Sequence, residues 1–290
     1  MKPTRIMSFL NKLDRWLGRG SYYPLQARLD PDRKYNQFIY AELLERLVAP
    51  ETRWLDGGCG HQILEGRLGE QENRLVRRAK LVVGCDSFGI SLTRHRTIRD
   101  RVMCTLNDLP FADESFTLVT LNMVVEHLTE PDRVFREIAR VLDPGGLVVL
   151  MTPNRNGYYV QLSNVARAVI PKKFQSKLIR YLESREAEDV FETHYLANTR
   201  RQLQRIMQAA GLEPHLINLS RGRAFFYFFA PLSVAELAII RCLGSLGFDE
   251  VVSDTLLAVY SKPARRQDAT RTSVRALERN VEASGNRSGL

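Results

Sequence analysis

Short apolar segments alternate with amphipathic segments through the first half of the chain. Residues 35–48 and 132–142 repeat apolar positions at the three- and four-residue spacing of a helix. Around them lie compact apolar runs that end or fill predicted strands, at 54–55, 81–85, 116–121 and 147–151. Uninterrupted apolar strands that alternate with helices are typical of a parallel sheet covered on both faces. The pattern therefore predicts an α/β fold built on a doubly wound sheet.

The second half of the chain departs from this alternation. Residues 200–210 again have helical spacing, and two apolar runs at 216–219 and 256–260 predict strands that close the sheet as an antiparallel hairpin. Two longer segments, at about 155–197 and 221–253, interrupt this plan. We expect them to form helical insertions over the carboxyl-terminal edge of an otherwise mostly parallel sheet.

Positive charge gathers at the two ends of the chain. The net charge is +9, of which residues 1–34 contribute +5 and residues 262–290 contribute +4, so residues 35–261 are neutral. We interpret these parts as a basic amphipathic amino-terminal helix, one domain, and a disordered basic tail. A neutral domain offers no basic groove, which disfavours nucleic acid as a partner. The amino-terminal helix fits either an anionic membrane surface or a lid packed over its own domain.

The spacing of cysteines and histidines bears on metal binding, and the apolar stretches bear on the cellular compartment. The four cysteines form no C-x-x-C pair, and no histidine is spaced as in a zinc site, so we expect no metal. Residues 1–20 lack a signal-peptide pattern, and no apolar stretch reaches the about 18 residues of a spanning helix. These observations predict a cytoplasmic protein.

The sequence DGGCG, at residues 56–60, directly follows the first predicted strand. Three glycines there let the main chain approach a ligand closely, and ligands of such sheets bind outside the carboxyl ends of the strands. The turn departs from the dinucleotide pattern G-x-G-x-x-G, because Gln62 stands where a further glycine could follow. A nicotinamide-dependent oxidoreductase is therefore disfavoured. Asp86, which ends the second strand, is placed to accept both hydroxyls of a ribose.

Four segments occur in order: DGGCG, GCD, LPFADESFTLVTLNMVVEHL and REIARVLDPGGLVVLMTPN. Together they resemble the class I S-adenosylmethionine-dependent methyltransferases, in the small-molecule, methyltransferase type 11-like group whose motif runs D-x-G-C-G. The resemblance covers about residues 35–261 and implies a Rossmann-like fold with S-adenosyl-L-methionine as cofactor.

The resemblance also implies roles for individual residues. Asp56 would fix the glycine loop and face the cationic methionine end, and Asp86 would bind the ribose. The dipole of the following helix would help the loop to hold the methionine carboxylate. Gly58 and Gly60 would let main-chain N–H groups approach this carboxylate, and Gly57 would bind the cofactor in the same turn. Leu106 and Asn107 would contact the adenine edge, and Asn122 would line the sulfonium.

Methyl transfer to an alcohol needs a base, because the attacking oxygen keeps its proton at neutral pH. His127 is the candidate base, with Glu126 or His194 as its orienting partner. A structural alternative stays open, in which Glu126 caps a helix start and His127 is merely hydrogen-bonded in place.

The acceptor is the least determined part of the prediction. Residues 224–229 and 232–246 are more apolar than a closing hairpin needs, so they fit an acceptor pocket, a homodimer face, a membrane contact or an extra helical layer. They favour a small-molecule or lipid-linked acceptor, methylated on a glycan, sugar or aromatic hydroxyl. They are also compatible with an enzyme that associates with the inner face of the membrane. The alternative is a non-catalytic scaffold or binding protein with the methyltransferase fold.

Overall fold

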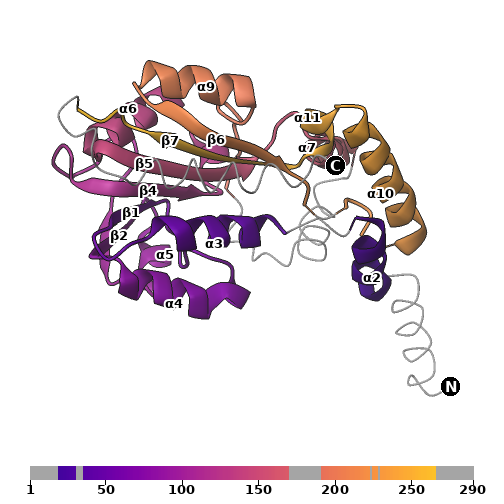
Figure 1. The fold of residues 1–290 in the computed structure, drawn as a ribbon, viewed down its shortest axis with the longest axis horizontal. Helices are drawn as coiled ribbons and strands as arrows, with labels where there is room; N and C mark the ends of the chain where they lie inside the picture. The colour runs from indigo at the N-terminus through magenta and orange to yellow at the C-terminus, as the bar shows by residue number, and fades with distance from the viewer. Residues whose placement is uncertain (1–18, 31–34, 170–190, 223, 228, 266–290) are drawn as a thin grey trace. The chain divides into compact units, whose positions relative to one another are not determined.

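The computed structural model describes residues 19–30, 35–169, 191–222, 224–227 and 229–265 (Figure 1). Seven strands in this part of the chain form one sheet, in the order β3-β2-β1-β4-β5-β7-β6. The first five strands of that order pair in parallel. The bounds are β1 Arg53–Gly57, β2 Leu81–Asp86, β3 Asp100–Met103, β4 Phe116–Asn122, β5 Leu142–Pro153, β6 Glu213–Ser220 and β7 Thr255–Ser261. The predicted α/β doubly wound sheet is confirmed.

The last two strands close the sheet in the antiparallel direction, as predicted. Near the start of β5 the N–H of Gly145 bonds the carbonyl of Lys262, which follows β7. At the other end of β5 the N–H of Asn154 bonds the carbonyl of Asp254, which precedes β7. The N–H of Asp254 in turn bonds the carbonyl of Ser220 at the end of β6. Each strand thus runs against its neighbour.

Helices cover the faces of the parallel part of the sheet. In Figure 1, α6 and α9 lie on one face, whereas α4 and α5 lie on the other. Helix α6 buries Val134, Ile138 and Val141, which recur every three or four residues, and this spacing explains why one side of the helix packs on the strands. The bounds are α3 Asn36–Leu47, α4 Gly69–Arg78, α5 Gly89–Thr93, α6 Pro131–Val141 and α9 Arg200–Ala209.

The segment Asp143 to Gly146 follows helix α6 and contains two adjacent glycines. Helix α6 ends at Val141, and Leu142 is already extended, so the glycines lie inside the irregular start of β5. Gly145 has φ of +80°, and a Cβ at Gly146 would lie 2.8 Å from the carbonyl oxygen of Asp143. The two glycines therefore permit a shift in the β4–β5 register.

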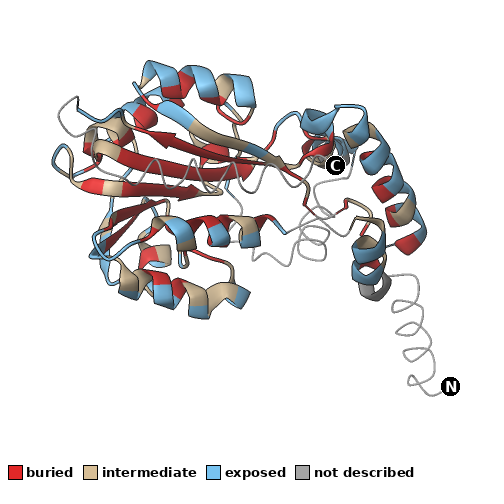
Figure 2. Cartoon of the chain, viewed as in Figure 1, coloured by how far each residue is buried: buried red, intermediate tan, exposed pale blue. Residues whose placement is uncertain are grey.

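Buried residues line the central strands, as Figure 2 shows in red. Trp54 and Leu55 of β1 are fully buried, and so are most residues of β5 and β7. The indole Nε1–H of Trp54 donates to Thr120 Oγ1 at 2.7 Å, which satisfies its polar atom inside the core. Strands buried on both faces explain why the sequence reads as continuous apolar runs instead of alternating ones.

The chain divides into two compact units. The sheet unit consists of Tyr40–Thr152, Thr193–Asn218 and Leu257–Leu290. The helical unit consists of Met1–Ile39, Pro153–Glu192 and Leu219–Leu256. The helices described in the helical unit, besides the start of α3, are α2 Arg19–Leu29, α7 Tyr158–Val169, α10 Ala230–Ser245 and α11 Asp249–Val252.

The helical unit has a small core of its own. Tyr22 of α2 is fully buried against Ala224, Tyr227 and Leu237, and its hydroxyl accepts the N–H of Ala224 at 2.8 Å. The carboxylate of Glu236 is also buried, and it accepts the N–H groups that precede α10 at residues 225 and 226. These contacts fix residues 224–226 as a turn packed against α10.

The apolar face predicted for the amino-terminal helix, from Ile6 to Leu17, lies outside the described residues. Among the helices that are described, none combines the length and the apolar character that crossing a bilayer requires.

Candidate active site

The glycine turn follows β1 at the edge where the parallel strands end. Gly58 and Gly60 have φ of +65° and +51°, a region that glycine reaches without steric cost. A Cβ at Gly58 would lie 2.6 Å from Cγ2 of Val124, so the turn packs directly on the segment after β4. A Cβ at Gly60 would meet no atom of the described chain within 4 Å. Bare main chain is therefore packed on one side of the turn and open at Gly60.

Asp86 ties this turn to the next strand end. Its Oδ2 accepts the N–H of Gly60 at 2.9 Å, and its Oδ1 accepts the N–H of Phe88 at 2.8 Å. Each carboxylate oxygen can accept more than one hydrogen bond, so these contacts leave acceptor capacity for a ribose hydroxyl. The prediction for Asp86 is compatible with this geometry.

Asp56 lies beneath the turn and is only 2% exposed. The hydroxyl of Thr120, on the neighbouring strand β4, donates to its Oδ1. Burial raises the pKa of Asp56 from 3.8 to about 7; the hydrogen bond from Thr120 opposes this, whereas the charges of Glu72 and Asp86 add to it. A carboxyl in this state is stabilised as an anion by any nearby cation. That response is what the predicted role beside a cationic ligand requires.

An ion pair that the sequence analysis did not predict holds the segment between the turn and helix α4. Glu72 is fully buried, accepts the N–H of Leu64 at 2.8 Å, and forms an ion pair with Arg96. Arg96 also bonds the carbonyl of Leu64. Helix α4 begins only at Gly69, nine residues beyond Gly60. The expected helix dipole is therefore not next in sequence to the turn, and an ion pair supports this segment instead.

The two residues predicted at the adenine edge occupy different surroundings. Leu106 is half-buried, and its Cδ2 would lie 3.0 Å from a Cβ at Gly57, so it borders the glycine turn. The amide of Asn107 donates to Glu130 Oε2 at 2.9 Å. This contact joins the segment after β3 to the start of α6.

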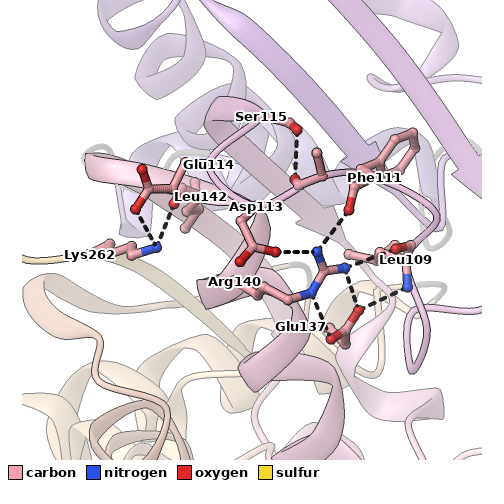
Figure 3. A network of polar contacts seen from close by, with 10 residues as sticks. Leu109, Phe111, Asp113, Glu114, Ser115, Glu137, Arg140, Leu142 and Lys262 are labelled. Atoms are coloured by element: carbon pink, nitrogen blue, oxygen red, sulfur yellow. Dashed lines mark hydrogen bonds and ion pairs between the residues drawn. The ribbon is translucent and has the colours of Figure 1, made fainter.

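The LPFADESF segment, residues 109–116, is anchored by Arg140 (Figure 3). The guanidinium donates to the carbonyl oxygens of Leu109 and Phe111 at 2.9 and 2.7 Å, and to Asp113 Oδ1 at 2.9 Å. It also pairs with Glu137 at 2.8 Å, and this hydrogen-bonded cation lowers the pKa of Glu137. The segment is thus a packing turn that Arg140 and Glu137 hold against helix α6.

The end of β4 is bonded to the segment that follows the glycine turn. The amide of Asn122 donates to the carbonyl of Ile63 at 3.0 Å, which bonds this strand end to the segment after the turn. Met123 follows with φ of +58°, an uncommon value for a residue with a side chain. This sharp change of direction leads into the short 3-10 helix Val125–His127.

The structure brings together the three residues predicted for the chemistry. His127 Nε2 lies 3.9 Å from Glu126 Oε1, and the main-chain N–H of His194 bonds the carbonyl of Glu126 at 2.8 Å. Glu126 is 3% exposed, whereas the side chain of His127 is 29% exposed. The described contact of His194 is thus a main-chain one, and the carboxylate nearest the candidate base is that of Glu126.

Thr152 and Asn198, two polar residues that the sequence analysis missed, hold Glu126 in place through hydrogen bonds. Thr152 Oγ1 donates to Glu126 Oε2 at 2.9 Å, and the amide of Asn198 donates to Thr152 Oγ1 at 2.6 Å. All three residues are buried. The sequence offered a partial indication, because the TPN motif that contains Thr152 ends an apolar strand. Asn198 comes from a distant segment, so its proximity was not predictable from spacing.

Comparison with known proteins assigns the chain to a family. A family model described as a methyltransferase domain matches residues 32–217. The match covers more than half of the chain, and the chain belongs to this family. It is a member of the class I S-adenosylmethionine-dependent methyltransferases, and S-adenosylmethionine is the cofactor of that class.

Individual relatives match over part of their length. A Mycobacterium tuberculosis protein named "Probable S-adenosylmethionine-dependent methyltransferase Rv3030" is 36% identical over 121 residues, 41% of this chain and 42% of the relative. The ubiquinone biosynthesis O-methyltransferase of Hahella chejuensis is 28% identical, over 53% of this chain and 62% of the relative. The ubiquinone/menaquinone biosynthesis C-methyltransferase UbiE of Cupriavidus necator is 27% identical, over 56% and 72%. The chain thus spans about half the length of the first of these relatives.

Proposed function

We propose that the protein transfers the methyl group of S-adenosylmethionine to a hydroxyl oxygen of a small-molecule or lipid-linked acceptor. A glycan, sugar or aromatic hydroxyl is the acceptor class that we favour. The observation that carries the proposal is the pairing of His127 with buried Glu126 on the segment that packs against the glycine turn. A base at this point serves a hydroxyl acceptor, since a hydroxyl must lose its proton on methylation.

The residues of the strand edge fit the parts of S-adenosylmethionine. We assign the main chain at Gly58 and Gly60 to the methionine carboxylate, because a bare turn exposes N–H donors. Asp86 is assigned to the ribose hydroxyls, Asp56 to the electrostatic balance of the cationic methionine end, and Asn122 to the sulfonium side. Leu106 and Asn107 are assigned to the adenine edge. The bound cofactor supplies an electrophilic methyl group, and the chain contributes orientation and charge.

Proton removal falls to His127. Because Glu126 Oε1 lies on the Nε2 side of the ring, we assign acceptance of the hydroxyl proton to Nδ1. The new bond joins the acceptor oxygen to the methyl carbon, and the carbon–sulfur bond breaks to leave neutral S-adenosylhomocysteine. The carboxylate of Glu126 stabilises the imidazolium that results. Glu126 is held for this role by Thr152 and Asn198.

The relatives support the reaction class without fixing the acceptor atom. One relative is named as an O-methyltransferase and another as a C-methyltransferase. The histidine–carboxylate pair favours oxygen. We further propose that the enzyme works in the cytoplasm, as a peripheral protein at the inner face of the membrane where a lipid-linked acceptor would be found.

Two measurements test the proposal. Calorimetric titration should show binding of S-adenosylmethionine and S-adenosylhomocysteine but not of NADH, and Asp86→Ala should weaken it. Intact binding in Asp86→Ala would refute the site assignment, and a preference for NADH would refute the cofactor.

Turnover is then followed as S-adenosylhomocysteine release with a phenol, a methyl glycoside and a polyprenyl-linked sugar as probes. Mass spectrometry distinguishes an O-methyl from a C-methyl product. His127→Ala should lower turnover far more than cofactor affinity, and His215→Ala, a histidine on β6, is the matched control. Equal turnover of both variants between pH 6 and 9 would contradict the base. Cofactor binding without transfer to any probe would favour the non-catalytic binding protein.

A further inference from the structure

Two cysteine thiols meet where the neighbouring strands β2 and β3 end. Cys85 of β2 is opposite Val102 of β3 in the parallel register, and Cys104 lies two residues beyond Val102. The N–H of Cys104 bonds the carbonyl of Asp86 at 3.1 Å, so the pairing of the two segments continues to this residue. Side chains two residues apart on a strand point to the same face of the sheet. Cys85 and Cys104 therefore share a face, where their thiols are hydrogen-bonded to each other.

The two thiols of this pair are not equivalent. Cys85 is fully buried, whereas Cys104 is half-buried and so reaches solvent. The hydrogen bond from Cys85 lowers the pKa of Cys104, although burial and the charges of Asp86 and Asp108 oppose this. The same hydrogen bond, together with burial, raises the pKa of Cys85. Cys85 is thus the donor and Cys104 the thiol that ionises, and the thiolate is the nucleophilic form of cysteine.

The other two cysteines are placed differently. A Cβ at Gly84 would lie 2.8 Å from Cys59 Sγ, and Gly84 is next to Cys85 on β2, so Cys59 packs on the opposite face of this strand. Burial raises the pKa of Cys59 far above its ordinary value. Cys242 is exposed on α10 in the helical unit. Cys85 is therefore the thiol within reach of Cys104.

We propose that Cys104 reacts with small disulfides of neutral or positive charge, and that Cys85 resolves the product into a Cys85–Cys104 disulfide. The Cys104 thiolate attacks one sulfur of the reagent RSSR, its S–S bond breaks, and RS⁻ leaves. Cys85 gives up its proton to this RS⁻ and attacks the sulfur of Cys104, so that a second RS⁻ leaves and takes up a proton from water. Two cysteine thiols are oxidised, and one RSSR is reduced to two RSH. The charges of Asp86 and Asp108 that act on Cys104 repel an anionic reagent.

The pair lies between two parts of the cofactor site assigned above, so its effect on the cofactor rests on the proposed function. Asp86, assigned to the ribose, directly follows Cys85, and Leu106, assigned to the adenine edge, is two residues beyond Cys104. Sulfur atoms in a disulfide lie only about 2 Å apart, so the bond draws the segment after β3 toward β2. The oxidised chain should bind S-adenosylhomocysteine about tenfold more weakly, which is the effect of losing one hydrogen bond to a charged group.

The test treats the reduced full-length chain with cystamine, a cationic disulfide, and with glutathione disulfide, which is anionic. Peptide mapping by mass spectrometry should show a Cys85–Cys104 disulfide, with the loss of two hydrogen atoms, that forms faster with cystamine. Cys85→Ser keeps a hydroxyl donor but has no second thiol, so Cys104 should retain half of the reagent as a mixed disulfide. Cys85→Ala also removes the donor, so the pH at which Cys104 reacts at half its maximal rate should rise. Cys242→Ser is the matched control and should form the disulfide as the wild type does.

Several results would overturn the proposal. One is the absence of the disulfide in the wild type, or a disulfide of Cys104 with Cys59 instead. Another is the same reaction midpoint in Cys85→Ala and Cys85→Ser, with cooperative urea unfolding as the check that both variants are folded. Equal rates with the two reagents would overturn the charge class.

The cofactor part of the proposal is read separately. Unchanged affinity for S-adenosylhomocysteine in the oxidised chain would overturn the coupling to the cofactor site. The disulfide itself is read from mass and needs no cofactor. A reduced chain that forms the disulfide but does not bind S-adenosylhomocysteine would therefore refute the proposed function and leave the thiol pair standing.

Discussion

A methyl group added at Gly58 should mainly lower stability, whereas one added at Gly60 should mainly weaken cofactor binding. Both residues have positive φ, so alanine pays the same kind of backbone cost at each position. The surroundings differ, because a Cβ at Gly58 would lie 2.6 Å from Val124 Cγ2, whereas one at Gly60 would meet no described atom within 4 Å. We assign the space at Gly60 to the methionine end of the cofactor.

These surroundings determine how much unfolding free energy and how much cofactor affinity each variant should lose. Placing alanine in the left-handed region costs about 1–2 kcal/mol of unfolding free energy at either site. Overpacking against Val124 adds about 1–3 kcal/mol for Gly58→Ala. Gly58→Ala should therefore lose roughly 2–5 kcal/mol in total, and Gly60→Ala roughly 1–2 kcal/mol. Gly60→Ala should nevertheless weaken S-adenosylhomocysteine binding by about tenfold or more, because the added methyl group occupies the ligand's place.

Urea unfolding measures the first quantity and calorimetric titration the second. The double variant Gly58→Ala/Val124→Ala separates the two terms at Gly58, since it removes the clash and keeps the backbone cost. It should recover part of the stability that Gly58→Ala loses. Wild-type affinity in Gly60→Ala, or no recovery in the double variant once the Val124→Ala loss is subtracted, would refute the reasoning about the turn.

Three further predictions follow from buried or paired charges. Because burial raises the pKa of Asp56 to about 7, its stabilising contribution is full below about pH 4 and is lost as the pH rises through 7. The free energy of unfolding in urea should therefore depend less steeply on pH in Asp56→Asn than in the wild type. Parallel pH dependences of the two proteins would contradict the raised pKa. Arg140→Met should cost about 2 kcal/mol at pH 7. Since Arg140 lowers the pKa of Glu137, that deficit should shrink as the pH falls through the lowered pKa, with exposed Arg136→Met as control; a deficit independent of pH would argue against the pair. Thr152→Val should cost about 2–3 kcal/mol by removing the hydrogen bond that Thr152 donates to buried Glu126, whereas Thr152→Ser should keep that bond. Equal unfolding of the two variants would exclude the hydrogen bond.

The sheet was predictable because its strands are buried on both faces. Each central strand therefore reads as a continuous apolar run, and the predicted bounds of β2 and β4 agree with the structure to one residue. Strand β3 was missed because its four residues are largely exposed and include Asp100 and Arg101. The predicted strand at 147–151 is shorter than β5, because the glycine pair at 145–146 occupies an irregular strand start that the apolar run does not include.

The positions of the candidate site residues were predictable where those residues lie at strand ends. Asp56, Asp86 and Asn122 each end or follow a parallel strand, so their meeting at one edge follows from the topology. The supports of the site are different, because Glu72 with Arg96 and Thr152 with Asn198 are brought together from segments far apart in the sequence. Such pairs depend on tertiary packing, which local residue patterns do not encode.

The crystal structure of the chain with S-adenosylhomocysteine tests the central claim most directly. The account predicts the methionine carboxylate within hydrogen-bond distance of the main-chain N–H groups around Gly58 and Gly60, with the ribose hydroxyls on Asp86. The nucleoside bound elsewhere, or the turn closed over by side chains of this chain, would contradict it.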